Sequence, residues 1–502
     1  MMKRRQFLRA GLMSAAGAAA LLSGGGLGAR ARPLENDPDM ARREAAEGIV
    51  VNDVHGQISP TRVAFIRTPA DTAALEKALE PGGGVALSGG RHAMGGQQFA
   101  AGRPLVDMRA MDKVIGIDRA ARTVTAEAGI TWPALMAVLN RDAPELSIIQ
   151  KQTGADDLTL GGALSANIHG RGLVMAPIIG DVESFTLRTA QDGVVTCSRS
   201  ENSELFALAI GGYGLFGVIQ TVTLRLMTRR KLRREVQMLG IDALIPMIEQ
   251  RIAEGCWYGD FQYKTDPAAE DFMRTGVFCC YRPVDDQAVL SEVARNLSLE
   301  DWQSLYDLAH DDKKAAFEKY SAYYLASHGN VYWSDSHQTS TYLKDQNVKY
   351  DRQRKNAAKS SLVISEIYAE REKLTEVMEA CRTAALRRGM NIVYGTVRFI
   401  EPDTESFLPW ARKRYACIIF NLHVRHTVPG LSKAQEDFRT LYDIALDHSG
   451  SFYLTYHRWA RKEQVLTAYP QMRAFIALKR KYDPYDKFVS DWYAHYREMF
   501  QI

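Results

Sequence analysis

Hydrophobic positions repeat with two different periods in the first half of the chain. Residues 68–79 begin with Thr-Pro and residues 132–139 begin with Trp-Pro, and both then place apolar side chains at helical spacing, which predicts helices. Shorter apolar runs at residues 84–87 and 123–129 predict strands. Residues 218–226 alternate apolar side chains with threonine or glutamine, which is typical of a half-buried strand. This half therefore predicts an α+β unit with mixed strands.

A second pattern follows the basic cluster at residues 229–234, where we expect a domain boundary. Residues 258–263 and 276–281 alternate in a way that predicts paired strands. Residues 392–399 and 417–424 predict later strands of the same domain. The second half thus predicts a separate domain built on an antiparallel sheet.

The N-terminus has the features of an export signal. Arg4-Arg5-Gln6-Phe7-Leu8 precedes an apolar, Gly/Ala-rich stretch, and Ala29-Arg30-Ala31 offers an A-x-A cleavage site. The apolar region from Ala10 to Leu22 is short and interrupted by glycine, so it suits a bilayer span poorly. We predict a signal for the twin-arginine export machinery over residues 1–31; the alternative is an uncleaved membrane anchor.

Composition narrows the classes of function. The chain has 502 residues, of which 46% are hydrophobic and 24% charged, so it is long enough for two cores. A formal charge of +4 is small, and no basic run is interleaved with aromatics outside the extreme N-terminus, so nucleic acid is not an expected partner. The six cysteines show no C-x-x-C spacing and do not cluster with histidines, so we predict no metal site and favour buried free thiols.

One glycine-rich loop carries the most specific chemistry. Residues 88–97 follow a predicted strand and combine four glycines with Arg91 and His92. Glycine allows positive φ and lets successive N–H groups approach an anion such as a pyrophosphate. The loop matches neither G-x-x-x-x-G-K-[ST] nor G-x-G-x-x-G, so the sequence predicts neither a P-loop nor a simple dinucleotide fold.

Two later segments repeat this chemistry and identify a family. Residues 158–172 contain Thr-Leu-Gly-Gly-Ala-Leu-Ser-Ala-Asn-Ile-His-Gly, and residues 211–219 are Gly-Gly-Tyr-Gly-Leu-Phe-Gly-Val-Ile. The order of the three segments resembles the FAD-binding domain of the vanillyl-alcohol oxidase and p-cresol methylhydroxylase superfamily over about residues 48–230. Residues 483–491 more weakly resemble the D-P-x-x-x-F ending of sugar and aldonolactone oxidases. The resemblance implies that the cofactor is FAD.

The resemblance also implies the fold class. It is α+β, with a two-part FAD-binding PCMH-type domain plus a substrate domain built on an antiparallel sheet flanked by helices. The predicted segments are a signal peptide at 1–31, a linker at 32–47, the FAD-binding domain at 48–232, the substrate domain at 233–460 with a helical insertion at about 285–325, and a C-terminal return to the FAD domain at 461–502.

His92 is the candidate for a covalent bond to FAD. Its loop resembles the R-G-x-G-H-S-x-x-G-Q loop of cytokinin dehydrogenases, in which the histidine carries FAD on the 8α carbon; here Ala93 replaces the serine. The alternative is that His92 only hydrogen-bonds loop carbonyls or a phosphate. Relatives with a doubly attached flavin use a cysteine between the two glycine segments, and no cysteine precedes Cys197, so we predict at most one attachment.

The same resemblance assigns further groups to the cofactor. Backbone and hydroxyl groups of the second segment would hold the pyrophosphate and ribityl chain, and the backbone near residue 218 would contact the adenine part. The predicted cofactor-binding set is Ser88, Gly89, Gly90, Arg91, His92, Ala93, Met94, Gln97, Thr153, Gly154, Thr159, Gly161, Gly162, Ser165, Ile168, His169, Gly217 and Ile219.

Ile168 bears on the electron acceptor. In relatives this position lies against the isoalloxazine, and a small residue there accompanies oxygen reactivity in aldonolactone oxidases. A bulky isoleucine therefore predicts a dehydrogenase that passes electrons to a quinone or cytochrome. The other interpretation is that Ile168 only packs in the core.

Candidate catalytic residues come mainly from the second domain. Thr396-Val397-Arg398 and Asn421-Leu422-His423 resemble the two strands that face the flavin in alditol oxidases, where the first strand carries E-x-R; Thr396 departs from that pattern, which puts polyol specificity in doubt. The segment at residues 456–461 resembles H-W-G-K. Histidine is a usable base near neutrality. The predicted catalytic set is His423, His457, Arg398 and His169, each of which has a surface or interdomain residue as its alternative.

The combined prediction is a periplasmic or otherwise exported FAD-dependent oxidoreductase. It would take a hydride onto flavin N5 from a CH–OH donor such as a sugar, polyol or lactone. The alternatives are amine oxidation like that of cytokinin dehydrogenases and a non-catalytic flavin-binding electron carrier. The expected partners are a small-molecule substrate and a quinone or cytochrome, with no stable membrane span after signal cleavage.

Overall fold

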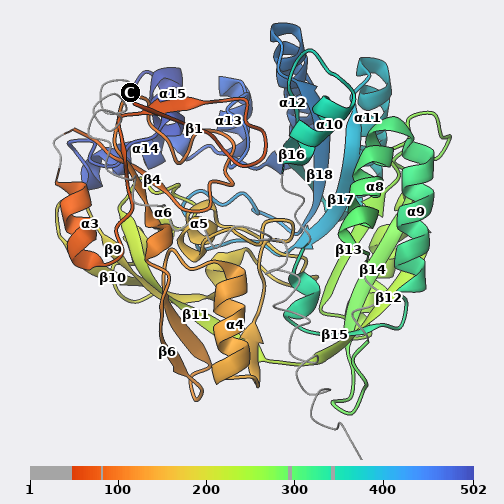
Figure 1. The fold of residues 1–502 in the computed structure, drawn as a ribbon, viewed down its shortest axis with the longest axis horizontal. Helices are drawn as coiled ribbons and strands as arrows, with labels where there is room; N and C mark the ends of the chain where they lie inside the picture. The colour runs from red at the N-terminus through yellow and green to blue at the C-terminus, as the bar shows by residue number, and fades with distance from the viewer. Residues whose placement is uncertain (1–47, 81–82, 292–296, 341–344) are drawn as a thin grey trace, which may run out of the picture.

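The computed structural model describes residues 48–80, 83–291, 297–340 and 345–502. The predicted signal peptide and linker at residues 1–47 lie outside the described residues. Two parts lie side by side in Figure 1. One contains the red to yellow strands together with the C-terminal helices, and the other is built on a large green and blue sheet.

A small parallel sheet opens the first part. Its strands β3 and β4 both pair in parallel with β5, and β1 and β2 form an antiparallel pair beside it. Leu75 and Leu79 pack in one apolar cluster with Val85 and Val106, which fixes helix α3 against the sheet. Asp71 caps this helix by accepting the N–H of Ala74 at 2.8 Å. The elements are β1 (Ile49–Val51), β2 (Thr61–Val63), β3 (Ile66–Arg67), α3 (Thr72–Leu79), β4 (Ala86–Ser88) and β5 (Leu105–Asp107).

A six-stranded antiparallel sheet completes the strands of the first part. The order is β10-β9-β11-β7-β6, and β8 also pairs with β11. β11 is the predicted half-buried strand, and its buried side chains alternate with partly exposed ones. The elements are β6 (Val114–Asp118), β7 (Thr123–Glu127), α4 (Trp132–Asp142), β8 (Leu146–Ile148), α5 (Leu160–Ala166), β9 (Val182–Arg188), β10 (Val194–Ser198), α6 (Ser203–Ala209) and β11 (Val218–Thr228).

An eight-stranded antiparallel sheet forms the second part. Its order is β15-β12-β14-β13-β17-β18-β16-β19, so strands distant in sequence become neighbours. All four predicted strands of this half are present, as β13, β14, β17 and β18. The strands are β12 (Lys231–Gly240), β13 (Tyr258–Tyr263), β14 (Thr275–Pro283), β15 (Val331–Trp333), β16 (Ser360–Glu370), β17 (Ile392–Ile400), β18 (Tyr415–Arg425) and β19 (Ser451–Phe452).

Helices cover both faces of this large sheet. Helices α7, α11 and α12 pack into the main core, whereas α9 packs Phe317, Tyr320 and Tyr324 against Val236, Val277 and Cys279 on the other face. The predicted insertion contains α8 and α9, and α10 follows it. The helices are α7 (Leu244–Ala253), α8 (Leu299–Asp311), α9 (Lys313–Ala326), α10 (Gln346–Gln353), α11 (Leu374–Arg388) and α12 (Val428–Asp447).

The C-terminal segment lies against the first part. Val85 donates its N–H to the carbonyl of Lys487 at 2.8 Å and accepts the N–H of Val489 at 3.0 Å, which extends the small parallel sheet. Figure 1 shows the blue C-terminal helices beside the red and orange elements. These helices are α13 (Lys462–Ala468), α14 (Met472–Tyr482) and α15 (Asp491–Phe500).

The architecture confirms the predicted α+β class with antiparallel sheets and flanking helices. One large apolar core runs through both parts and includes Trp132, Ile168, Tyr368 and Trp410. All six cysteines are buried free thiols. No helix of the described residues has the length and apolar character of a membrane span.

Candidate functional site

The three glycine-rich segments meet in space. Gly89 leaves no room for a side chain because Thr159 lies against it, and a Cβ on Gly90 would lie 2.5 Å from the carbonyl oxygen of Asp157. The second segment contacts the third, since Tyr213 donates its N–H to the carbonyl of Ser165 at 2.9 Å. The segments therefore form one surface, as the prediction of a single extended ligand requires.

The first loop presents free backbone donors. The N–H groups of Gly90, Arg91, His92 and Ala93 donate to no acceptor within the described part of the chain. Arg91 is held at φ 61°, in the left-handed region, which turns the backbone sharply at this point. The four residues are half-buried. Successive unpaired N–H groups in a turn are donors of the kind that bind an anion, so this loop is the place for one.

His92 makes one ring contact and leaves its other ring nitrogen free. Its Nδ1 lies 2.9 Å from Nε2 of His55, and its Nε2 is buried without a hydrogen-bond partner. Burial, reinforced by the nearby charges of His55 and Lys151, lowers the pKa of His92 to about 3. The imidazole is therefore neutral at physiological pH, and Nε2 carries a lone pair in the tautomer in which Nδ1 donates to His55.

The loop that carries His55 is itself held in place. Asp53 is buried and accepts the N–H groups of His55 at 2.9 Å and Gly56 at 2.6 Å. A carboxylate that binds successive N–H groups fixes the turn between them. The orientation of His92 thus depends on a turn about forty residues before it.

The second segment uses its own N–H groups internally. Leu160 donates to the carbonyl of Ile130 at 2.8 Å, and Gly161 donates to the carbonyl of Ala128 at 2.7 Å. Gly162 donates to Oγ1 of Thr159 at 3.2 Å. The predicted phosphate donors Gly161 and Gly162 are engaged in these bonds, so the free donors belong to the first loop.

The other predicted cofactor residues divide into anchors and free groups. Gln97 is an anchor, because its side chain accepts the N–H of Gly95 at 2.8 Å and donates to the carbonyl of Leu454 at 2.7 Å. Met94 donates its N–H to Thr455 at 3.0 Å. Ser88 Oγ and Thr153 Oγ1 are buried without a partner.

The remaining three predicted cofactor residues are Gly154, Gly217 and Ile219. Gly154 donates its N–H to Ser340 at 2.6 Å. Gly217 directly precedes β11, and Ile219 lies within it and pairs with Leu187 of β9.

The segment that ends the second motif is held from the second part of the molecule. Asn167 donates to Asp403 at 2.8 Å, and its carbonyl accepts the indole N–H of Trp410 at 2.9 Å. Tyr453 donates its hydroxyl to the carbonyl of Ala166 at 2.5 Å. Ile168 follows directly and is 4% exposed. These bonds fix the backbone directly before Ile168.

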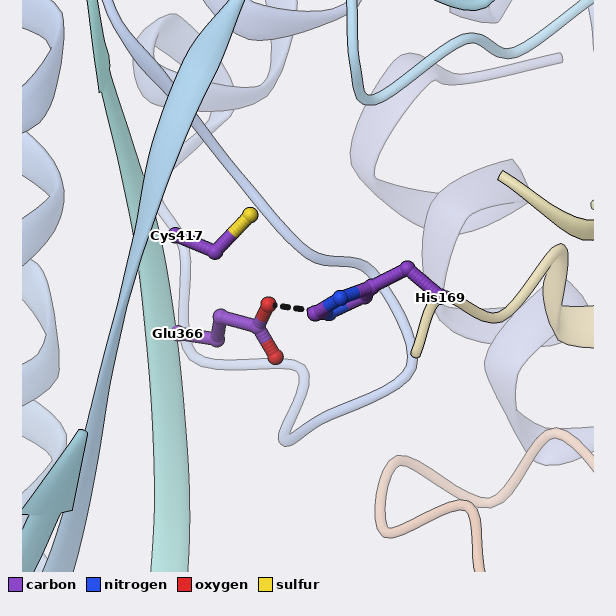
Figure 2. A group of neighbouring side chains, drawn as sticks. All are labelled: His169, Glu366 and Cys417. Atoms are coloured by element: carbon purple, nitrogen blue, oxygen red, sulfur yellow. Dashed lines mark hydrogen bonds and ion pairs between the residues drawn. The ribbon is translucent and has the colours of Figure 1, made fainter. Parts of the chain in front are cut away.

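His169 and Glu366 form a buried pair at the centre of this contact. Nε2 of His169 lies 2.7 Å from Oε1 of Glu366, and the two side chains point toward each other in Figure 2. The other oxygen of Glu366 accepts the hydroxyl of Tyr456 at 2.9 Å. Although burial opposes it, the charge of His169, its hydrogen bond and the charge of Arg398 lower the pKa of Glu366.

Both ring nitrogens of His169 are engaged. Its Nδ1 lies 3.1 Å from the carbonyl oxygen of Gly170, and its Nε2 lies 2.7 Å from the carboxylate of Glu366. These contacts hold the ring in place and leave neither nitrogen turned toward a substrate, so the structure gives His169 a positioning contact instead of the predicted catalytic role.

Cys417 approaches this pair, and the three side chains could in principle hold a metal ion (Figure 2). However, the 2.7 Å contact between His169 and Glu366 is a hydrogen-bond distance. Two ligand atoms around a transition metal stand about 2.0–2.3 Å from the ion and hence farther from each other. Burial also raises the pKa of Cys417, which disfavours the thiolate that a metal needs. The geometry is that of an ion pair.

Glu366 belongs to a row of residues across the large sheet. Four residues on neighbouring strands lie opposite one another in order. They are Gln262 of β13, Thr396 of β17, Ile419 of β18 and Glu366 of β16. Residues directly opposite each other point to the same face. Because His169 contacts Glu366, this face is turned toward the first part of the molecule.

Unsatisfied polar atoms gather on this face. Gln262 Oε1 and Thr396 Oγ1 are buried without a partner, as are Nε and Nη1 of Arg398, two residues along β17. Asp260 Oδ1 is also unpartnered. A buried cation with two free donors is costly unless it binds an acceptor. The face therefore has the chemistry of a binding surface for an oxygen-rich group.

Two further cations border the face. Arg171 lies 3.6 Å from Asp260, and the buried ammonium of Lys151 donates to the carbonyl of Gln152 at 3.0 Å and pairs with Asp156. Burial lowers the pKa of Lys151, and its charge is close enough to act on His92, Arg171 and Arg398. Lys151 thus connects the first loop with the polar face of the sheet.

The other two predicted histidines lie elsewhere. His423 is on the same face of β18 as Cys417 but six residues further, roughly 20 Å along the strand, where its ring lies 5.1 Å from that of His310. His457 stacks on Trp459 at 4.5 Å and lies against Gly56, beside the turn that holds His55. The structure does not bring these two histidines to the His169–Glu366 pair.

Sequence reasoning missed several members of the site. His55, Lys151 and Glu366 are central to it, and none was predicted. A signal for Glu366 exists, because it interrupts a run of apolar and small residues, Leu-Val-Ile-Ser-Glu-Ile-Tyr, that forms a buried strand. A charged residue inside such a strand requires a buried partner.

The residues of the first loop fit an FAD molecule. Its pyrophosphate needs N–H donors and its ribityl chain needs hydroxyl partners, and the loop offers four free N–H groups together with the unpartnered Ser88 and Thr153 hydroxyls. FAD bound here would supply a hydride acceptor.

Comparison with known proteins agrees with this fit. Residues 60–198 match the family described as FAD binding domain, which confirms the predicted kinship and cofactor. Mitochondrial L-galactono-1,4-lactone dehydrogenase 1 of Oryza sativa subsp. japonica is 34% identical over 128 residues, covering 26% of this chain and 21% of that protein. Cytokinin dehydrogenase 4 of the same species is 32% identical over 166 residues, covering 32% of this chain and 30% of that protein.

These alignments span about a fifth to a third of each relative's own length. Among solved structures, a solvent-stable cholesterol oxidase superposes with a TM-score of 0.65 over 89% of this chain and 98% of that one, at 18% identity. That likeness shows a shared fold.

The packing of the first loop gives a direct test. We expect Gly90→Ala to lower the FAD content of the purified protein several-fold, because its Cβ would lie 2.5 Å from the Asp157 carbonyl and separate the first two segments. Gly116→Ala is the matched control, since a Cβ there meets nothing within 4 Å. Absorbance at the flavin band against protein concentration measures the content. Full FAD content in Gly90→Ala would contradict the assigned cradle.

Proposed function

We propose, from the premise that residues 60–198 belong to the FAD binding domain family, that the whole chain is an exported FAD-dependent oxidoreductase acting on a CH–OH donor. A sugar, polyol or lactone is the substrate class. The single observation that carries the proposal is Arg398, a buried guanidinium with two unpartnered donors on the sheet face next to Glu366 and His169.

The chain's own residues bind and orient the donor. The Nε and Nη1 groups of Arg398 are placed to donate to the substrate oxygen and to stabilise negative charge that develops there as its proton leaves. Thr396 and Gln262 offer further hydrogen-bonding atoms in the neighbouring row. Removing water from these groups strengthens each interaction.

The charge balance favours an oxygen-rich donor over a protonated amine. Arg171, Arg398 and Lys151 border the site, whereas Asp260 and Glu366 already face Arg171 and His169. A protonated amine placed beside these cations would be repelled. Hydroxyl, lactone or carboxylate oxygens can accept the free donors. One relative is named for a lactone and another for cytokinin, so the comparisons alone do not choose between an oxygen-rich substrate and an amine. The hydrogen-bond donors of this face favour the oxygen-rich substrate.

His92 supports a covalent flavin. Its Nε2 is the free ring nitrogen, whereas Nδ1 is engaged by His55. The low pKa keeps the ring neutral and nucleophilic. We assign the attachment to Nε2. A covalent bond would retain the cofactor after export, and the export part of the proposal rests on the Arg4-Arg5 signal with its A-x-A site.

Ile168 supports an acceptor other than oxygen. Its side chain is buried and the backbone directly before it is held by Trp410 and Tyr453, so it cannot swing aside easily. A bulky side chain at this position would keep oxygen from the reactive flavin carbon. A quinone or cytochrome is then the electron acceptor.

Anaerobic flavin reduction tests the reaction class. We expect an aldonolactone, sugar or polyol to bleach the flavin, and Arg398→Met to slow this step by roughly 100-fold or more, because transition-state charge loses its donors. The matched control is Arg387→Met, at an exposed position on α11. Reduction by amines alone would favour amine oxidation. Full FAD content without reduction by any donor would favour an electron carrier.

Mass spectrometry tests the flavin bond. We expect denatured wild-type protein to stay yellow and its tryptic peptide 92–109 to carry the mass of FAD, and His92→Ala to release the flavin. His448→Ala, at the end of α12, should keep it bound. The intact mass should also show the loss of residues 1–31. Free flavin from the wild type would refute the covalent bond and leave FAD binding intact.

Stopped-flow reoxidation in air tests the acceptor. We expect slow reoxidation of the reduced wild type and an increase of at least tenfold in Ile168→Ala, because a path to the flavin opens. Ile178→Ala removes the same side-chain volume from the same core, next to Ile168, and should change the rate little. Fast reoxidation of the wild type would contradict the blocked-oxygen assignment.

A further inference from the structure

Two buried cysteines lie in contact at neighbouring strands of the large sheet. Cys256 lies just before β13 and Cys280 lies within β14, strands that run side by side in Figure 1. Their Sγ atoms are 3.5 Å apart, and the two residues are 3% and 0% exposed. Among the six cysteines, all of which are described, no other pair is in hydrogen-bond contact.

Adjacent Cys279 provides an internal comparison. Successive side chains of a strand point to opposite faces. Cys280 packs in the main core, whereas Cys279 packs under α9 with Val236 and Val277. Cys279 therefore faces away from Cys256, although it is next to Cys280 in sequence.

Charged side chains surround the pair. Glu235 of β12 lies opposite Cys280, and Arg251 and Arg282 bind its two carboxylate oxygens at 3.0 Å and 2.7 Å. The contact with Cys280 and the charges of both arginines lower the pKa of Cys256, although burial and the charge of Glu235 oppose them. The contact with Cys256 together with burial raises the pKa of Cys280. Of the two thiols, Cys256 is therefore the more easily ionised.

A metal ion is a poorer occupant of this cluster. Glu235, Cys256 and Cys280 place ligand atoms within 4.8 Å of one another. Both oxygens of Glu235 are already bound by arginines, and those two cations would lie beside any metal ion. The arrangement of two sulfurs next to two cations suits sulfur oxidation better than metal binding.

We propose that Cys256 and Cys280 are an oxidation site that forms an intramolecular disulfide when a peroxide reaches it. The Cys256 thiolate attacks the O–O bond of hydrogen peroxide and becomes a sulfenic acid as the first water leaves. The Cys280 sulfur attacks that sulfenic sulfur, the S–S bond forms and the second water leaves. Two thiols lose two electrons and two protons, and one peroxide becomes two waters.

The geometry requires a small closing movement. The sulfurs must approach from 3.5 Å to about 2.05 Å, which is a shift of about 1.5 Å. The bond would join residues 24 positions apart and tie the start of β13 to β14. Such a bond restricts the unfolded chain, so the oxidised protein unfolds at a higher temperature. This site is independent of the proposed redox reaction.

Peptide mapping after peroxide treatment tests the proposal. Full-length protein is treated with hydrogen peroxide, remaining thiols are alkylated, and the digest is analysed without reductant. We expect tryptic peptides 252–264 and 275–295 to appear joined, two hydrogens lighter than their sum, and to separate with dithiothreitol. The Tm should rise on oxidation and return on reduction.

Single substitutions identify the sulfur that reacts. Cys279→Ser should keep the joined peptides, whereas Cys280→Ser and Cys256→Ser should lose them. Circular dichroism and flavin absorbance establish that each variant is folded. Loss of the cross-link in Cys279→Ser with retention in Cys280→Ser would overturn the assignment. So would separate peptides in wild type under conditions that oxidise its exposed methionines.

Discussion

The contact between His169 and Glu366 is the constraint on which the rest of the site depends. It joins the glycine-rich segment of the first part to the central strands of the second, and both residues are fully buried. Breaking a buried pair leaves an uncompensated charge, so the two parts cannot separate at this point cheaply. The bonds from Trp410 and Tyr453 fix the same backbone, so the cofactor segment and the polar sheet face hold one relative position.

The same pair sets the electrostatics between the two parts. Glu366 is already bound by His169 and Tyr456, whereas the guanidinium of Arg398, two residues along β17 from the Glu366 row, keeps two unpartnered donors. Lys151 is paired with Asp156 and Arg171 faces Asp260. An electron-rich group between the parts would meet fixed donors that need no rearrangement, which is the condition for strong electrostatic stabilisation.

The sequence predicts the cofactor half of the site far better than the substrate half, for a physical reason. A phosphate cradle is made from consecutive backbone groups, so its glycines stand together in residues 88–97 and remain visible as a motif. The polar face is assembled from single residues on β13, β16 and β17, which the strand order brings together. No local pattern encodes that register. The motif also predicted that Gly161 would donate its N–H to a phosphate. In the structure Gly161 lies close to Ala128 and donates this N–H to the carbonyl of Ala128.

Strand register also bears on the position where this chain departs from E-x-R. Thr396 supplies no carboxylate beside Arg398, which would leave the guanidinium without the acid found in alditol oxidases. In the sheet, however, Glu366 occupies the same row as Thr396, two strands away, and its charge acts on Arg398. The row therefore retains a carboxylate, but that carboxylate is bound to His169 and Tyr456. Arg398 keeps its free donors for another acceptor because the acid near it is already engaged.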